Sequence, residues 1–163
     1  MVNTTIAAVG RLLGVVVVLL VALGTTARAA GTDASATRAA EASALEVMDA
    51  FLTAFNASDV PAWADTLLFP HVRLASGQVR VYPDRQSFID AMDMQAFAAS
   101  TGWRHSTWDD MAVVQSSPDK VHIRVRFSRF DADGELIGAY DSLYVIERVD
   151  GRWGVRARSS FAP

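Results

Sequence analysis

The chain has 163 residues, no cysteine, a hydrophobic content of 51% and a formal net charge of −3. This length corresponds to one ordinary domain, and the lack of cysteine excludes disulfides, thiolate metal sites and a cysteine nucleophile. Because Arg11 and Arg28 precede the first acidic residue, Asp33, the rest of the chain carries a charge of −5, which argues against general nucleic-acid binding.

The first 29 residues are typical of an export signal. Arg11 is followed by the apolar run Leu12 to Leu23, which is shorter than the ~20 residues of a membrane-spanning helix. Small residues then lead to an A-x-A pattern ending at Ala29, as signal peptidase requires. We therefore predict a cleaved signal peptide over residues 1–29, a periplasmic or secreted protein, and no membrane attachment after cleavage. The alternative is an uncleaved N-terminal anchor.

The next segment predicts a linker and then a first helix. Residues 30–42 are small and polar, as expected of a linker. Ser43 and Glu46 have the spacing of a capping box, and the apolar residues at steps of three and four beyond them predict a helix that ends near Asn56.

Three further elements precede a change of periodicity. Asp59 is placed to cap a second short helix, and residues 69–76 alternate as a short strand before a glycine turn. Asp84 is placed to cap a third helix over residues 85–99, which Gly102 stops.

From Trp103 onward the apolar period changes from 3.6 to 2. Four antiparallel strands joined by short turns are expected, over residues 103–115, 121–130, 136–148 and 152–161. This order predicts an α+β fold, in which three N-terminal helices pack on a curved, mostly antiparallel sheet. If the sheet curls around the helices, the result is a cone-shaped roll with a pocket between the layers.

The order of these elements and their local sequence resemble the nuclear transport factor 2 superfamily, in its SnoaL-like and ketosteroid-isomerase-like branch. The segments that carry the resemblance are 51–59 with Trp63, 67–72, and 150–155 leading into a last strand that ends at Phe161. The resemblance places a SnoaL-like domain over residues 43–163. It implies a cone-shaped pocket, frequent dimers, and functions that range from isomerases to pure binding modules, so the fold alone does not give the function.

The resemblance also allows the catalytic positions of ketosteroid isomerase to be checked one by one. The family's tyrosine falls on Phe51, which has no hydroxyl, and its aspartate base falls near Ser76. The third position, a pocket aspartate on a late strand, matches Asp141. One match in three argues against ketosteroid isomerase chemistry.

Three residues are candidate acids or bases, namely Asp141, His105 and Asp109. Asp141 shares a register with Leu143 and Val145, which would carry its carboxylate into the pocket. The alternative is a rim aspartate paired with an arginine. His105 and Asp109 share one face of a regular strand but lie about 13 Å apart along it. Only a bulge or another strand's carboxylate would therefore complete a dyad, and the alternative is a solvated edge strand.

We expect the pocket to bind a small, largely apolar molecule. The ligand-binding candidates are His71, Arg73, Trp103, Trp108, Tyr140 and Ser159. His71 and Arg73 are placed either to hold an anionic group at the pocket mouth or to face solvent. The three histidines have no spacing such as H-x-H, so neither a metal nor another cofactor is expected.

One face of the predicted sheet is rich in arginine and tyrosine. It comprises His122, Arg124, Arg126, Ser128, Tyr140, Ser142, Tyr144, Arg156, Arg158 and Ser160. Arginine and tyrosine are favoured in interfaces, so a homodimer is expected.

Three hypotheses follow for the function. The first is an exported domain that binds a small apolar molecule, with no catalysis assigned. The second is a cofactor-independent lyase or isomerase that uses His105 or Asp141, and the third is a dimeric interaction module.

Overall fold

The computed structural model describes residues 33–163, so the signal peptide predicted over residues 1–29 lies outside the described range. Residues 37–163 form one compact unit, and the fold below is that of this unit. Among the described residues, no helix is long and apolar enough to cross a bilayer.

The first described helix covers residues 33–56. It includes residues 33–42, which the sequence predicted as part of a linker, and it passes through Ser43 without a break. Ala40 is 2% exposed and Ala44 is fully buried. Alanine favours helix formation, and here its small side chain lets the helix pack closely on the core, which composition alone did not indicate.

Three short helices follow. They are α2 (Val60–Asp65), α3 (Arg85–Ala91) and α4 (Met94–Thr101). The third helix was predicted as one continuous element and is in fact two. The interruption comes at Asp93, whose carboxylate accepts the N–H of Ala96 at 2.8 Å and so caps a new helix. Gly102 ends α4 in the left-handed conformation, with φ 73°.

Six strands form one sheet in the order β2-β1-β6-β5-β4-β3. Their bounds are β1 (Leu67–Ala75), β2 (Gln78–Tyr82), β3 (His105–Ser117), β4 (Lys120–Phe130), β5 (Leu136–Val149) and β6 (Arg152–Ser160). All neighbours are antiparallel except β1 and β6, which are parallel. The hairpin strand β2 was not predicted.

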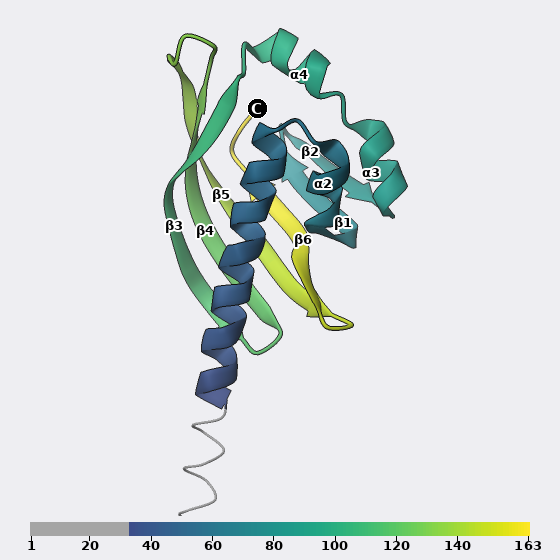
Figure 1. Ribbon diagram of the computed structural model, residues 1–163, viewed down its shortest axis with the longest axis vertical. Helices are drawn as coiled ribbons and strands as arrows, with labels where there is room; N and C mark the ends of the chain where they lie inside the picture. Colours follow the sequence, from purple (N-terminus) through teal and green to yellow (C-terminus); the bar gives the residue numbers. More distant parts are fainter. Residues whose placement is uncertain (1–32) are drawn as a thin grey trace, which may run out of the picture. The chain divides into compact units, whose positions relative to one another are not determined.

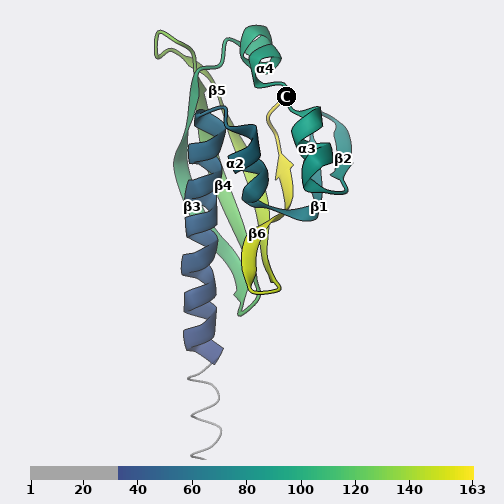
Figure 2. The same cartoon turned by 45° about the vertical axis from the view of Figure 1, so that its right-hand side comes forward.

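The helices cover one face of this curved sheet, which we call the inner face. The helix of residues 37–56 and α2 lie against it, while α3 lies beside β1 and β2, and α4 leads from α3 to the start of β3 (Figures 1 and 2). The predicted α+β architecture, with helices packed on a curved and mostly antiparallel sheet, is thus confirmed.

The core lies between the helices and the inner face. Val121, Ile123 and Val125 of β4 are fully buried there, and Ile123 pairs with Tyr144 of β5, which is 1% exposed. Met48 of the first helix is also fully buried and belongs to the same cluster.

The predicted register of β5 is wrong. Tyr140, Ser142 and Tyr144 lie on the inner face, and Asp141 and Leu143 lie on the outer face. The error has a physical cause, because the outer face is itself apolar at this point, so apolar residues did not mark the core side. The same error placed Arg158 and Ser160 outside, although they pair with Tyr144 and Ser142.

Candidate ligand-binding cavity

A cavity of about 250 Å³ lies between the helices and the inner face of the sheet. Its upper wall, which we call the aromatic roof, consists of Phe51, Phe55, Trp63, Phe88 and Phe97. Trp63 stands at the centre of this roof, with ring centroids 5.4 Å from Phe51, 5.0 Å from Phe55 and 4.9 Å from Phe88. Such edge-to-face contacts stabilise an aromatic cluster in a defined geometry.

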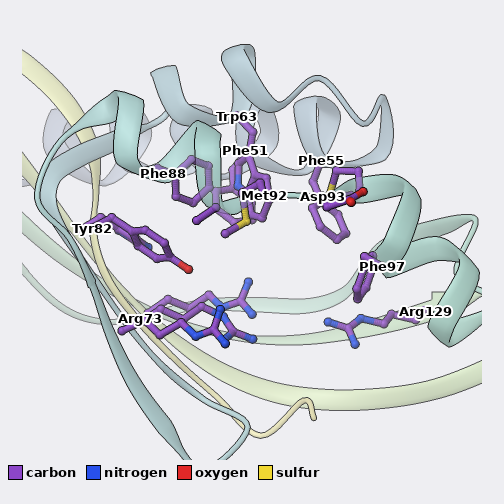
Figure 3. Close-up of a pocket in the computed structure, with 15 residues that line it drawn as sticks. Phe51, Phe55, Trp63, Arg73, Tyr82, Phe88, Met92, Asp93, Phe97 and Arg129 are labelled. Carbon is purple, nitrogen blue, oxygen red and sulfur yellow. The ribbon is translucent and has the colours of Figure 1, made fainter.

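The opposite wall carries four guanidinium groups. This arginine floor consists of Arg73 from β1, Arg80 from β2, Arg129 from β4 and Arg158 from β6. Arg73 pairs with Arg80 on one side and with Arg158 on the other, so three arginines stand side by side on adjacent strands. Figure 3 shows the aromatic side chains facing Arg73 and Arg129 across the cavity.

The arginine floor is not neutralised by acidic residues. Within residues 33–163, the ion pairs all involve other side chains. Arg80 donates to the side-chain oxygen of Gln78 at 3.2 Å, and Arg158 donates to the Tyr144 hydroxyl at 3.5 Å. Like charges on neighbouring strands destabilise a sheet. The pKa of Arg73 is lowered, mainly because the residue is partly buried and also because the charge of Arg158 repels its own. The floor is therefore strongly electropositive.

Arg129 is the most deeply buried of these arginines, with 6% of its surface exposed. Its guanidinium carbon lies 5.1 Å from the ring centroid of Phe97, 5.5 Å from that of Phe127 and 5.3 Å from that of Tyr140. These cation–π contacts hold the charge in place without neutralising it. Burial, and then repulsion from Arg158, lowers the pKa of Arg129.

Three buried side-chain N–H groups in the described part of the chain have no hydrogen-bond partner. They are Trp63 Nε1, Arg129 Nε and Arg158 Nε. All three belong to residues that line the cavity, and all three can only donate. Because buried polar groups are nearly always paired, these three donors show that the cavity wall is rich in donors and short of acceptors.

His71 from β1 also lines the cavity and is 4% exposed. Burial lowers its pKa to about 4, against the opposing effect of a hydrogen bond to the Val155 carbonyl, so the ring is neutral at pH 7. Its Nδ1 lies 3.1 Å from that carbonyl oxygen and must carry the proton to donate to it. Nε2 is consequently left as an acceptor.

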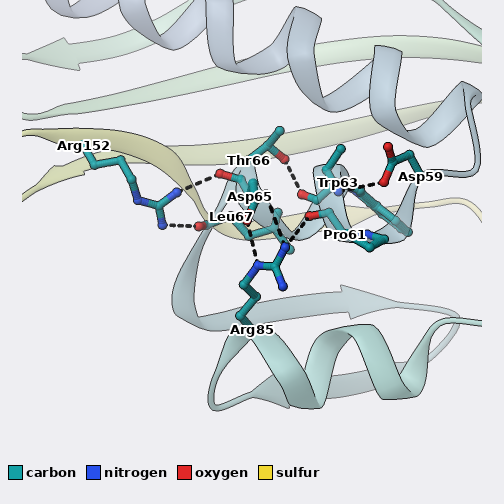
Figure 4. A network of polar contacts seen from close by, with 9 residues as sticks. Asp59, Pro61, Trp63, Asp65, Thr66, Leu67, Arg85 and Arg152 are labelled. Atoms are coloured by element: carbon teal, nitrogen blue, oxygen red, sulfur yellow. Dashed lines mark hydrogen bonds and ion pairs between the residues drawn. The ribbon is translucent and has the colours of Figure 1, made fainter.

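Polar contacts at both ends of α2 hold Trp63 in the roof (Figure 4). At the start of the helix, Asp59 accepts the N–H of Ala62 at 3.0 Å. At its end, Asp65 accepts from Arg85 Nε at 2.7 Å, and this contact is the main reason that the pKa of Asp65 is lowered.

A second arginine fixes the chain just after α2. Arg152 of β6 donates to the backbone carbonyls of Asp65 at 2.7 Å and Leu67 at 2.5 Å. Together with Arg85 of α3, it ties α2 to a helix and to the sheet, so the roof and the floor belong to one connected structure.

None of the candidate acids and bases lines the cavity. The placement of Asp141 in the pocket is wrong, because its carboxylate is on the outer face, half-exposed and 3.4 Å from Arg126 Nη1. His105 stacks on Phe130, with ring centroids 4.9 Å apart.

A bulge does occur at Asp109, as the predicted dyad with His105 would require. The carboxylate nevertheless accepts from Ser128 Oγ at 2.6 Å and from Thr107 Oγ1 at 3.0 Å. His105 and Asp141 lie on the outer face, because they alternate with residues of the inner register, and Asp109 lies there with its partner Ser128.

Two of the six predicted ligand contacts, His71 and Arg73, line the main cavity. Trp108 lines a side cavity of about 20 Å³ that shares Phe51, Phe55, Arg129 and Arg158 with the main one. Trp103 supports the roof from behind, because its ring packs 4.8 Å from that of Phe55 and its Nε1 donates to Ser106 Oγ at 2.9 Å.

The remaining two predicted contacts lie elsewhere. Tyr140 is on the inner face under Arg129, and Ser159 is exposed on the outer face. The sequence reasoning missed Arg129, although strict alternation with Val125 and Phe127 would have placed it inward. Arg80 and Tyr82 were missed together with the whole of β2.

Comparison with known proteins agrees with this fold. The family described as NTF2-like protein (DUF6841) matches residues 40–160. No curated protein matches the chain.

Several solved structures are similar in fold. One is a protein of unknown function with a cystatin-like fold from Nostoc punctiforme (11% identity, 76% of this chain and 90% of that chain, TM-score 0.63). Another, from Catenulispora acidiphila, is in complex with S-DNPA (15% identity, 76% and 93% coverage, TM-score 0.60). A third is a ketosteroid isomerase-like protein from Erwinia carotovora atroseptica (24% identity, 75% and 96% coverage, TM-score 0.50). At such identities the likeness shows the fold alone. With its family match over residues 40–160, the chain belongs to the NTF2-like family DUF6841.

Proposed function

We propose that this domain binds a small organic acid with an apolar body in the cavity between the aromatic roof and the arginine floor. The apolar body would lie against the roof, and the acidic group would accept hydrogen bonds from the floor. This changes the expected ligand from a largely apolar molecule to an amphipathic anion. The observation that carries the proposal is that the four arginines of the floor face the aromatic roof across the cavity and form no ion pair with a carboxylate of residues 33–163.

The size of the cavity limits the size of the ligand. A volume of about 250 Å³ lies just below the ~300–1,000 Å³ typical of pockets for drug-sized compounds. A compound with a single ring and a short substituent is therefore favoured over a multi-ring one.

The proposal concerns binding and includes no reaction. An enzyme of the lyase or isomerase type was expected to use His105 or Asp141, and both residues lie on the outer face of the sheet. His71 lines the cavity, and burial keeps it neutral with a pKa of about 4, so it is a weak base at pH 7.

A thermal-shift comparison of matched acids and amides tests the proposal. Benzoate, phenylacetate and cinnamate would be compared with the corresponding amides, which have nearly the same shape but no charge. A ligand that binds the folded state raises the melting temperature, and the rise increases with the ratio of ligand concentration to Kd. We expect the acids, at millimolar concentrations, to raise it and the amides to leave it unchanged.

Two variants test whether the rise in melting temperature comes from binding in the cavity. Arg158→Gln in the floor is expected to abolish the shift, whereas Arg126→Gln on the outer face is expected to retain it. Equal shifts with acids and amides, or no shift with any acid, would contradict the proposed function.

A second candidate function is association of two copies through the outer face. Leu74 of β1, Val79 and Val81 of β2 and Leu143 of β5 are apolar residues of this face, and they are 42%, 67%, 58% and 40% exposed. Ser159 of β6 lies between Leu74 and Leu143. An exposed apolar patch of this kind marks an interaction site.

The charges on the same face favour a second copy as the partner. These charges form ion pairs within the face. Arg124 Nη2 lies 2.8 Å from Asp110 Oδ2, and Arg126 Nη1 lies 3.4 Å from Asp141 Oδ2. The face therefore has little unpaired charge to repel an identical face in a two-fold contact.

Light scattering after size-exclusion chromatography tests this second candidate. A dimer is expected at micromolar concentration, and Val79→Glu should convert it to a monomer. Val114→Glu, at a residue of the opposite edge strand that is 53% exposed, serves as the matched control and should leave the dimer intact. A wild-type monomer under these conditions would contradict association.

Export completes the proposal, on the evidence of the N-terminal sequence alone. Mass spectrometry of the protein produced from the full-length sequence would locate the mature N-terminus. A start at Ala30 or Gly31 is expected, and an intact chain in the membrane fraction would indicate the uncleaved anchor instead.

A further inference from the structure

The positive charge of the cavity exceeds what one acidic group can neutralise. The arginine floor supplies four guanidinium groups, and arginine stays protonated in proteins. Asp93 is the acidic residue among those that line the cavity, and its carboxylate already caps α4 through the N–H of Ala96. Arg80 is exposed to solvent, but a ligand with a single negative charge would still leave most of the charge of the other three arginines uncompensated.

The arginines approach the cavity from two ends. Arg158 pairs with Tyr144 of β5, whereas Arg129 of β4 pairs with Gly138 of the same strand. Tyr144 and Gly138 are six positions apart, so the two backbone positions are roughly 20 Å apart along the strand. The two arginine side chains extend toward each other from these positions, since both line the small side cavity and the charge of Arg158 repels that of Arg129. Figure 3 accordingly shows Arg73 and Arg129 reaching into the cavity from opposite ends.

Resting on the proposed function, we infer that the ligand is a flat organic dianion with two separated acidic groups. One group binds Arg73 and Arg158, which are neighbours on parallel strands, and the other binds Arg129. The apolar body between them packs against the aromatic roof. An aromatic ring with two carboxylates has this shape and fits the volume of the cavity.

The arginines at the two ends are available to this ligand. Neither Arg158 nor Arg129 forms an ion pair with a carboxylate of residues 33–163. Two separated carboxylates provide acceptors at both ends, and guanidinium groups bind carboxylates through short, charge-assisted hydrogen bonds.

Calorimetric titration with four probes tests the inference on the unaltered protein. The probes are benzene-1,3-dicarboxylate, benzene-1,4-dicarboxylate, benzoate and benzamide, at equal ionic strength and neutral pH. At least one dicarboxylate is expected to bind about tenfold more tightly than benzoate, because it gains one charge-assisted contact. Benzamide is expected to bind least tightly.

Substitution of the arginine at one end of the cavity should weaken the binding of the dicarboxylate selectively. Arg129→Gln is expected to reduce its affinity about tenfold and that of benzoate less than threefold, since benzoate can use the other end. Arg126→Gln, on the outer face of the same strand, has the same loss of charge and should change neither affinity. The comparison among probes in the unaltered protein stands even where a variant fails to fold.

Three outcomes would overturn the inference. If benzoate binds as tightly as both dicarboxylates, the second acidic group has no partner, although the proposed function survives. If phenyl phosphate, with both charges on one group, binds more tightly than either dicarboxylate, the acidic groups are not separated. If none of the anions binds, the proposed function fails with the inference.

Discussion

Arg73 of β1 and Arg158 of β6 are direct neighbours in the parallel ladder that joins these strands, and no carboxylate within residues 33–163 forms an ion pair with either. Like charges in this relationship oppose folding. The anionic ligand proposed above would neutralise this pair, which otherwise reduces the stability of the empty protein.

Removal of one of these charges should stabilise the empty protein. Arg73→Gln is expected to raise the free energy of unfolding by about 0.5–1 kcal/mol at low ionic strength, because it relieves repulsion from Arg80 and Arg158. Urea unfolding measures this change. Added salt should reduce the difference in unfolding free energy between Arg73→Gln and the wild type, because salt screens the same repulsion in the wild type.

The control for this experiment is Arg126→Gln on the outer face. It removes an exposed ion pair with Asp141, so it is expected to change stability by less than about 0.5 kcal/mol. If Arg73→Gln proves less stable than this control at low salt, repulsion within the floor is not significant.

Asn56 is predicted to contribute strongly to stability, because its side chain joins the first helix to the edge strand β3. Its Oδ1 accepts the N–H of Ser106 at 2.8 Å, and its Nδ2 donates to the carbonyl of Ser106 at 2.9 Å. Asn56→Ala would leave both backbone groups unpaired beside a buried residue, at a cost of about 2–4 kcal/mol. Chemical denaturation should show this loss, whereas Gln115→Ala, at an exposed position of the same strand, should be nearly neutral.

The outer-face residues that were candidate acids and bases should not affect ligand binding. His105→Gln and Asp141→Asn are each expected to leave the affinity for benzene-1,3-dicarboxylate within twofold of the wild type, because neither side chain lines the cavity. Calorimetric titration decides the point. A large loss of affinity in either variant would place the ligand outside the cavity.

Local signals in the sequence predicted most of the fold. Helical spacing identified the helix that ends at Asn56, and Asp84 and Asp59 cap α3 and α2 as expected. The four long strands were located to within two residues at each end. These elements follow from periodicity and capping, which depend on neighbours in the chain.

The registers that form the site were harder to predict. The inner face of β5 consists of Tyr140, Ser142 and Tyr144, and its outer face carries Leu143 and Val145. A rule that turns apolar residues inward fails where a sheet presents apolar residues on both faces. The same rule excludes buried arginines, so the floor that contains Arg129 and Arg158 was not foreseen.

The buried state of His71 predicts a loss of stability in acid. Its pKa is about 4 in the folded protein and about 6.5 when unfolded. Between these values the unfolded chain binds more protons, so the stability contributed by neutral His71 is fully present above pH 6.5 and falls as the pH drops toward 4. At about 1.4 kcal/mol per pH unit, the loss between pH 7 and pH 4.5 is about 2–3 kcal/mol.

Urea unfolding at pH 7 and pH 4.5 measures this loss, with His71→Gln as the test variant. Glu147 and Asp65 have lowered pKa values, so they also reduce stability in acid, but equally in both proteins. The variant should be less stable than the wild type at pH 7 and should lose about 2–3 kcal/mol less on acidification. Met92→Ala, which alters the cavity without removing a titratable group, should retain the wild-type pH dependence. Equal losses in wild type and His71→Gln would mean that His71 is not buried in its neutral form.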